Sequence, residues 1–160
     1  MSQRRVVVTG LGIVSPVGLS IVEAWDNITS GRSGIRPITS FDVSDFSVRF
    51  GGTIERFDVS EYVAKKDARK MDIFLHYGVA AGIQAFRDAG LVVSEQNAER
   101  IGVSIGSGIG GLLGIEKNYD AYKNGGPRKI SPFFAPSSII NMISGNLSIM
   151  YGLKGPNIAM

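Results

Sequence analysis

Apolar positions in this chain alternate between short β-branched runs and longer stretches with helical spacing. The runs at 5–9 and 101–105, and a third beginning at Pro156, predict strands, and the strand at 101–105 is expected to be buried. An S-x-x-E capping pattern from Ser20 predicts the start of a helix. Strands that alternate with helices indicate an α/β fold, with a mixed, mainly parallel sheet and helices on its faces.

Longer helices are predicted downstream. The longest covers 68–89, and its apolar side chains surround much of its circumference, which is typical of a largely buried helix. Helices are also expected at 112–122 and, with proline in the first turn, at 136–150. The segment 48–54 predicts a hairpin or an edge strand. With no internal repeat or linker, the pattern indicates one domain.

The composition favours a globular domain and argues against disulfide-bonded, membrane and nucleic-acid-binding proteins. The 160 residues are 44% hydrophobic and 19% charged, which is typical of a globular domain. Cysteine is absent and His76 is the single histidine, so neither a disulfide nor a Cys/His metal site is expected. No apolar run is long enough for a signal peptide or a membrane span, so we expect a cytoplasmic protein without membrane partners. A net charge of +3 is too small to indicate nucleic-acid binding.

A glycine-rich loop, Gly106–Gly111, follows the second predicted strand and precedes a predicted helix. Its G-x-G-x-x-G spacing is that of a dinucleotide-binding loop. The acidic residue expected about 20 positions later would lie in a Gly/Pro loop instead of at the end of a strand. A nicotinamide or flavin site therefore stays an alternative, and we expect no cofactor. Ile109, isolated among glycines, is either a plug in the fold or a movable wall facing an apolar ligand.

Ser104 lies in a G-x-S-x-G pattern, which resembles the nucleophile elbow of serine hydrolases. It falls inside the predicted strand, however, and His76 precedes it in the chain. Without an available base the hydroxyl is a weak nucleophile. We therefore interpret Ser104 as a small strand residue and His76 as a hydrogen-bonded core residue.

Basic residues gather in the segment 65–70 and again at Arg128 and Lys129. At a helix start, like charges four residues apart repel each other, and the helix dipole disfavours cations. The cluster is either a solvated surface or a docking face for an acidic partner, on which charge sets association rate and orientation.

Several segments together resemble the β-ketoacyl-acyl carrier protein synthases, the condensing enzymes of fatty-acid synthesis, and within them the synthase II branch. The likeness runs nearly end to end. It is carried by 4–12, Gly31–Ile35, Arg69–Asp72, Ile105–Gly111, Gly126–Phe134 and Gly152–Pro156.

The resemblance implies a thiolase-like fold of two duplicated α/β halves and a homodimer. It also implies a reaction in which an acyl chain passes from its carrier to an active-site cysteine. Malonyl-carrier protein then loses carbon dioxide, and its carbanion attacks the acyl thioester. We expect residues 1–160 to be the N-terminal portion of such a ketosynthase domain, truncated before the nucleophile. The cysteine and both catalytic histidines of the family would lie beyond Met160, so no catalytic residue is expected in this chain.

The resemblance also assigns roles to residues that are present. Ile109 matches the isoleucine that gates the acyl pocket, and Phe134 matches a pocket residue that reaches across the dimer interface. The basic positions that dock the acidic carrier protein correspond to Lys66, Arg69, Lys70, Arg128 and Lys129. A non-catalytic carrier-binding or dimerisation module is the second alternative for the chain by itself.

Overall fold

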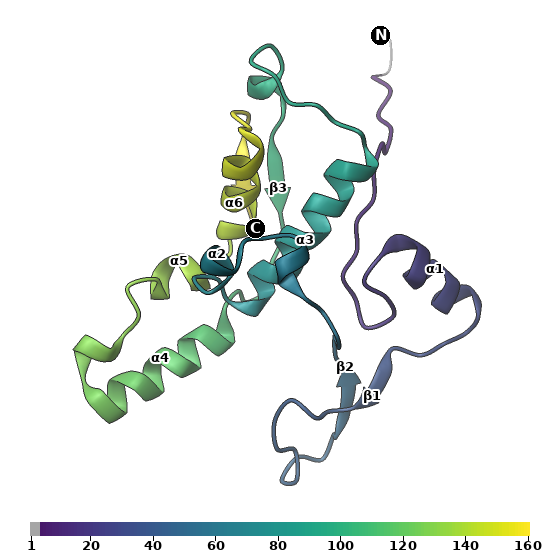
Figure 1. Ribbon diagram of the computed structural model, residues 1–160. Coiled ribbons are helices and arrows are strands. Elements are labelled where there is room, and N and C mark those ends of the chain that lie inside the picture. The colour runs from purple at the N-terminus through teal and green to yellow at the C-terminus, as the bar shows by residue number, and fades with distance from the viewer. Residues whose placement is uncertain (1–3) are drawn as a thin grey trace.

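The computed structural model describes residues 4–160 of the chain (Figure 1). The α-helices are α1 (Ile21–Thr29), α2 (Lys65–Ala68), α3 (Ile73–Asp88), α4 (Leu112–Gly125), α5 (Phe134–Ser138) and α6 (Met142–Tyr151). The strands are β1 (Ile35–Pro37), β2 (Phe50–Gly52), β3 (Val103–Ile105) and β4 (Asn157–Ala159). Single turns of 3₁₀-helix are η1 (Val59–Glu61), η2 (Ala98–Arg100) and η3 (Pro127–Lys129).

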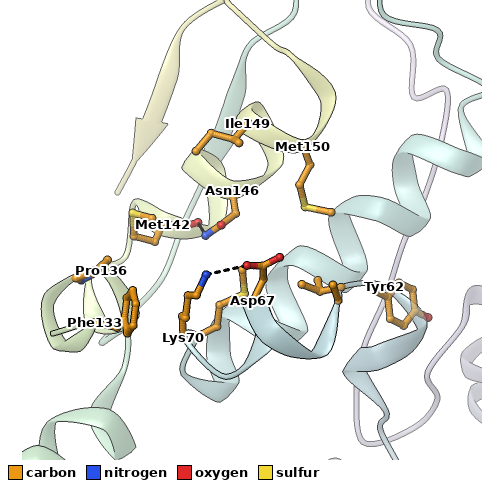
Figure 2. A pocket seen from close by; sticks show the side chains of 12 residues that line it. Tyr62, Asp67, Lys70, Phe133, Pro136, Met142, Asn146, Ile149 and Met150 are labelled. Atoms are coloured by element: carbon orange, nitrogen blue, oxygen red, sulfur yellow. Dashed lines mark hydrogen bonds and ion pairs between the residues drawn. The ribbon is translucent and has the colours of Figure 1, made fainter. Parts of the chain in front are cut away.

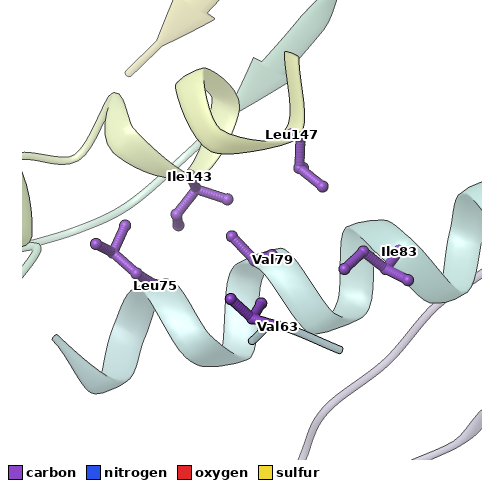
Figure 3. Close-up of a cluster of buried hydrophobic side chains, with 6 residues drawn as sticks. All are labelled: Val63, Leu75, Val79, Ile83, Ile143 and Leu147. Carbon is purple, nitrogen blue, oxygen red and sulfur yellow. The ribbon is translucent and has the colours of Figure 1, made fainter. Parts of the chain in front are cut away.

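The core lies between α3 and α6, as Figure 3 shows. Its buried apolar side chains are Val63, Leu75, Val79, Ile83, Ile143 and Leu147. The two helices approach closely because α3 presents glycines where α6 presents branched side chains. A Cβ on Gly78 would lie 2.6 Å from Ile143 Cδ1, and one on Gly82 would lie 2.5 Å from Leu147 Cδ1. The predicted burial of the longest helix is confirmed.

Two small sheets complete the architecture. β3 and β4 pair in parallel, with Val103 opposite Asn157, and both strands contact α6. β1 and β2 pair antiparallel, with Ile35 opposite Gly52, so the segment 48–54 does supply a hairpin-type strand. The strands predicted at 101–105 and from Pro156 are confirmed with shorter bounds, but the expected burial of the first is wrong, since β3 is only partly buried and Ser104 is exposed.

The strand predicted at 5–9 does not form. Residues 4–14 run extended without a partner strand, and Val6 is 86% exposed. The segment is held instead against α3, where Gln84 Oε1 accepts from the Ile13 N–H at 3.1 Å. Figure 1 shows it beside that helix. A β-branched run needs a neighbouring strand to become a ladder, and none lies beside it within the described residues.

Two predicted helices are divided in the structure. The helix predicted at 68–89 begins at Ile73, because Asp72 has extended backbone and stands as its N-cap residue. The helix predicted at 136–150 is interrupted after Ser138, and Ile139 is extended. The Ser138 hydroxyl donates to the Phe134 carbonyl at 2.8 Å, a backbone contact that competes with continued helix.

The helix start at Ser20 is confirmed. Its hydroxyl accepts from the Glu23 N–H at 3.3 Å, and the Glu23 carboxylate accepts from the Leu19 N–H at 2.7 Å. Among residues 4–160, no helix combines the length and the apolar character that crossing a bilayer requires. Large apolar side chains are nevertheless exposed, including Trp25 at 65% and Ile149 at 78%. Exposed apolar surface of this extent is typical of contact surfaces.

Candidate functional site

The Gly106–Gly111 loop connects β3 to α4 and carries Ile109 outward. The Ile109 side chain is 71% exposed, so it does not plug the core of the described chain. Gly110 has a φ of +84°, which a β-branched residue would not tolerate. The end of the loop is fixed, because the Gly111 N–H donates to the Ser138 carbonyl at 3.0 Å. The structure therefore presents Ile109 at the tip of a loop whose far end is held by α5.

The N-terminus of α4 already holds an anionic acceptor from the chain itself. The Asp72 carboxylate accepts a hydrogen bond from the Gly114 N–H, and Asp72 is only 9% exposed. Backbone N–H groups at a helix start are what a dinucleotide loop offers to a pyrophosphate. Here a buried carboxylate stands at that place, and it would repel a phosphate. The geometry therefore argues against the dinucleotide alternative.

Phe134 lies at the start of α5, half-buried against α4. It lines an apolar hollow of about 240 Å³ together with Ile115, Tyr119, Tyr122 and Ile130. Ile109 does not line this hollow. Within the chain, the two residues expected in the acyl pocket therefore do not line a common hollow.

The first basic cluster surrounds α2. Lys66 lies on that helix, and Arg69 and Lys70 follow in the turn to α3, all three exposed. The helix expected to carry the whole cluster is wrong, because α2 ends at Ala68 and Lys70 lies beyond it. Lys70 instead pairs with Asp67 at 2.9 Å, and this hydrogen bond holds the pKa of the Asp67 carboxyl below its usual value.

The second basic cluster, Arg128 and Lys129, forms η3 just beyond the C-terminus of α4. Both side chains are exposed. Arg69 and Lys70 lie instead beside the N-terminal half of α4, around Leu113 and Gly114. A helix of 14 residues spans about 21 Å, so the length of α4 separates the two clusters.

Another hollow lies on the other side of Lys70, between α2 and α6 (Figure 2). Its volume is about 440 Å³, within the range of small-molecule pockets. Most of its lining is apolar, and in Figure 2 the Lys70–Asp67 ion pair lies at its centre. The apolar lining includes Tyr62, Met71, Phe133, Met142, Ile149 and Met150. Neither Ile109 nor Phe134 lines it, and the sequence pattern did not indicate it.

His76 and Ser104, the residues of the hydrolase-like pattern, both make contacts that belong to the fold. Nε2 of His76 lies 2.9 Å from the Ala68 carbonyl oxygen, which confirms that the residue is hydrogen-bonded. The expected core position is wrong, because His76 is only partly buried and lines a hollow beside Arg69. Ser104 lies within β3, opposite Ile158 of β4, as the strand interpretation requires. Asp72 was missed as a site residue. The sequence carried only an N-cap signal at this position, and the Asp72 side chain does not cap α3 but accepts from Gly114 of α4.

Comparison with known proteins identifies the family. Residues 3–160 match the model of the β-ketoacyl synthase N-terminal domain. The chain is 60% identical over 160 residues to 3-oxoacyl-[acyl-carrier-protein] synthase 2 of Vibrio cholerae, covering 100% of this chain and 39% of that protein. It is 51% identical over 160 residues to the protein of the same name from Coxiella burnetii, again covering 39% of it. The chain thus spans about two fifths of the length of these curated relatives.

Solved structures agree on the fold. The ishigamide ketosynthase/chain length factor superposes with a TM-score of 0.86 at 25% identity, covering 99% of this chain and 40% of that one. A type II polyketide synthase acyl-carrier protein in complex with its ketosynthase superposes with a TM-score of 0.77 at 26% identity, covering 95% and 40% of the two chains. The predicted thiolase-like α/β class is confirmed. The chain belongs to the β-ketoacyl synthase family, of whose N-terminal domain it has the sequence and the fold.

Proposed function

We propose that this chain is the N-terminal portion of a ketosynthase domain whose whole protein elongates fatty acyl chains. The observation that supports this most strongly is the 60% identity over all 160 residues to a 3-oxoacyl-[acyl-carrier-protein] synthase 2. In the proposed reaction an enzyme cysteine takes the acyl group from carrier protein as a thioester. Decarboxylation of malonyl-carrier protein then gives a carbanion, which attacks the thioester carbonyl and expels the cysteine sulfur. The product is a β-ketoacyl-carrier protein two carbons longer.

The chain's own contribution to this reaction is binding. Ile109, exposed on a loop fixed at its far end, would form the movable wall of the acyl pocket. Phe134 would line the same pocket once a second subunit stands beside it. The clusters Lys66–Lys70 and Arg128–Lys129 would dock an acidic carrier protein, and the solved complex of a related ketosynthase with an acyl-carrier protein supports a partner of this kind.

Location and assembly belong to the same proposal. The 160 residues contain no cysteine, so nothing in them calls for an oxidising compartment, and a cytoplasmic enzyme is proposed. A homodimer is proposed because Phe134 and Ile109 do not meet within one chain, so a shared pocket requires a second copy.

Activity is tested by incubating acyl-carrier protein and malonyl-carrier protein with the protein at the full length of its relatives, and in parallel with residues 1–160. The β-ketoacyl product is followed by mass spectrometry. The full-length protein is expected to form a product two carbons longer, and residues 1–160 none. Absence of product with the full-length protein and competent carriers would refute the proposed activity.

Docking is tested separately by measuring the affinity for carrier protein after Arg128→Glu and Lys129→Glu. A weaker complex is expected, and unchanged affinity would exclude these residues from the docking face. The second candidate, a non-catalytic carrier-binding module, predicts carrier binding without any product at full length. Heat stabilisation by a nicotinamide or flavin nucleotide, and none by an acyl ligand, would favour the dinucleotide alternative.

A further inference from the structure

A second hollow lies between the α2–α3 turn and the first half of α4, and we call it the α3–α4 groove. Its volume is about 390 Å³. The side chains that give it its character are Arg69, Lys70, Asp72, His76, Lys117 and Asn118. Three of these are cations, contributed by two segments that are far apart in the sequence.

Two of the cations have no counter-charge. In the part of the chain that the structure describes, neither Arg69 nor Lys117 forms an ion pair, whereas Lys70 is paired with Asp67. Asp72 is the one carboxylate that lines the groove, and it accepts from the Gly114 N–H. The acidic residues that flank Lys117 on α4, Glu116 and Asp120, do not line it. The groove therefore has a net positive potential.

The uncharged polar groups of the groove are already satisfied within the chain. The Asn118 side chain donates to the Gly114 carbonyl at 2.8 Å and accepts from the Ser131 N–H at 2.8 Å. Nε2 of His76 lies 2.9 Å from the Ala68 carbonyl, and the Ser137 hydroxyl donates to Phe134. A small anion would find few preset donors here. The long, exposed side chains of Arg69 and Lys117 suit an extended acidic surface better.

We propose that the α3–α4 groove receives an acidic surface segment of the carrier protein, and that Lys117 is a docking residue. This inference rests on the proposed function, because it names a further contact with the same partner. It also accounts for the separation of the two basic clusters. Lys117 lies on α4, between the Arg69–Lys70 turn at one end of the helix and Arg128–Lys129 beyond the other. The docking face then extends from the Arg69–Lys70 turn onto the first half of α4.

The test measures association and dissociation rates of an acidic acyl-carrier protein with the full-length protein, at low and at high salt. Lys117→Gln and Lys117→Glu are compared with Lys123→Glu, a matched control on the same helix. Lys123 is exposed but lies over the Tyr119 ring at 5.7 Å and does not line the groove. Lys117→Glu is expected to weaken binding about fivefold at low salt, mainly through a slower association, with Lys117→Gln in between. The difference should shrink as salt rises.

The outcomes separate this inference from the proposed function. If the wild-type protein binds no carrier protein, both the proposed docking function and the role of Lys117 are refuted. If it binds, and Arg128→Glu weakens binding while Lys117→Glu behaves like Lys123→Glu, the docking function stands and the role of Lys117 is refuted. Far-ultraviolet circular dichroism of each variant verifies that exposed substitutions leave the helices intact.

Discussion

The carboxylate of Asp72 and the backbone N–H of Gly114 are hydrogen-bonded across 42 positions of sequence. Asp72 precedes α3, and Gly114 lies in the first turn of α4, so one side chain ties the starts of two helices together. The turn that carries Arg69 and Lys70 is thereby fixed relative to the loop that carries Ile109. One buried hydrogen bond, between Asp72 and Gly114, therefore positions both the proposed docking residues and the proposed pocket wall.

Replacing Asp72 is expected to be costly. Asp72→Ala leaves the Gly114 N–H without its acceptor, and a lost hydrogen bond to a charged group lowers the free energy of unfolding by about 1.5–3 kcal/mol. Urea-induced unfolding measures the change. Asp88→Ala is the matched control, because the Asp88 carboxylate accepts from the Leu11 N–H at an exposed site. A loss of only about 0.5 kcal/mol is expected there. Equal losses for the two variants would contradict the anchoring role of Asp72.

The close approach of α3 and α6 predicts opposite effects for two chemically identical substitutions. Gly82→Ala would place a methyl group against Leu147, which is 2% exposed and cannot move aside, so a loss of about 1–3 kcal/mol is expected. Gly145→Ala on α6 meets no atom nearer than Met142 Sδ at 3.9 Å. Alanine is the better helix former there and should stabilise by roughly 0.5–1 kcal/mol. Thermal unfolding of both variants checks the signs, and stabilisation by both would refute the tight packing.

Ile109→Phe is expected to change substrate selectivity more than overall activity. A larger side chain on the Gly106–Gly111 loop would shorten an apolar pocket, so long acyl chains should be excluded more strongly than short ones. Initial rates of the full-length protein with acyl-carrier proteins of increasing chain length give the readout. Val92→Phe is the control, since Val92 is also 78% exposed but lines none of the hollows described above. An equal loss at every chain length would remove Ile109 from the pocket wall.

The burial of Tyr77 affects how the free energy of unfolding depends on pH in the alkaline range. Burial raises the pKa of the Tyr77 hydroxyl above its ordinary 10.0, since the phenolate is poorly solvated there. The unfolded chain then loses this proton at lower pH than the folded one. The contribution of Tyr77 to stability is therefore full below pH 10.0 and is lost as pH rises toward the folded-state pKa. Urea midpoints measured across this range should fall less steeply for Tyr77→Phe, and identical slopes would contradict the burial effect.

The sequence pattern predicts the helices and strands of this fold well. It predicts poorly which distant segment each of them contacts. The helix at Ser20 was predictable because its capping side chains lie within a few residues of the backbone groups that they bind. The strand expected at 5–9 failed, since a strand is defined by its neighbour and the pattern carries no information about one. The division of the helix predicted at 68–89 follows from Asp72, whose contact with Gly114 is equally invisible in local spacing.

The candidate site shows the same limit. Ile109 and the basic residues stood out because each is chemically conspicuous among its sequence neighbours. Lys117 did not, because Glu116 and Asp120 flank it and the local charge balances. Only the packing of α4 against the α2–α3 turn places Lys117 in one groove with Arg69, which neither Glu116 nor Asp120 lines.

The pairing of α3 with α6 also has a consequence for synthesis on the ribosome. Val79 of α3 packs with Ile143 of α6, which is translated about 60 residues later. At a translation rate of roughly 5–20 residues per second, α6 is synthesised several seconds after α3. The segment 4–14 emerges earlier, and its glycines already fit against Ala81 and Ala85 of α3. One side of the nascent helix is thus covered at once, while its Val79 side is the surface that a chaperone would bind until α6 arrives.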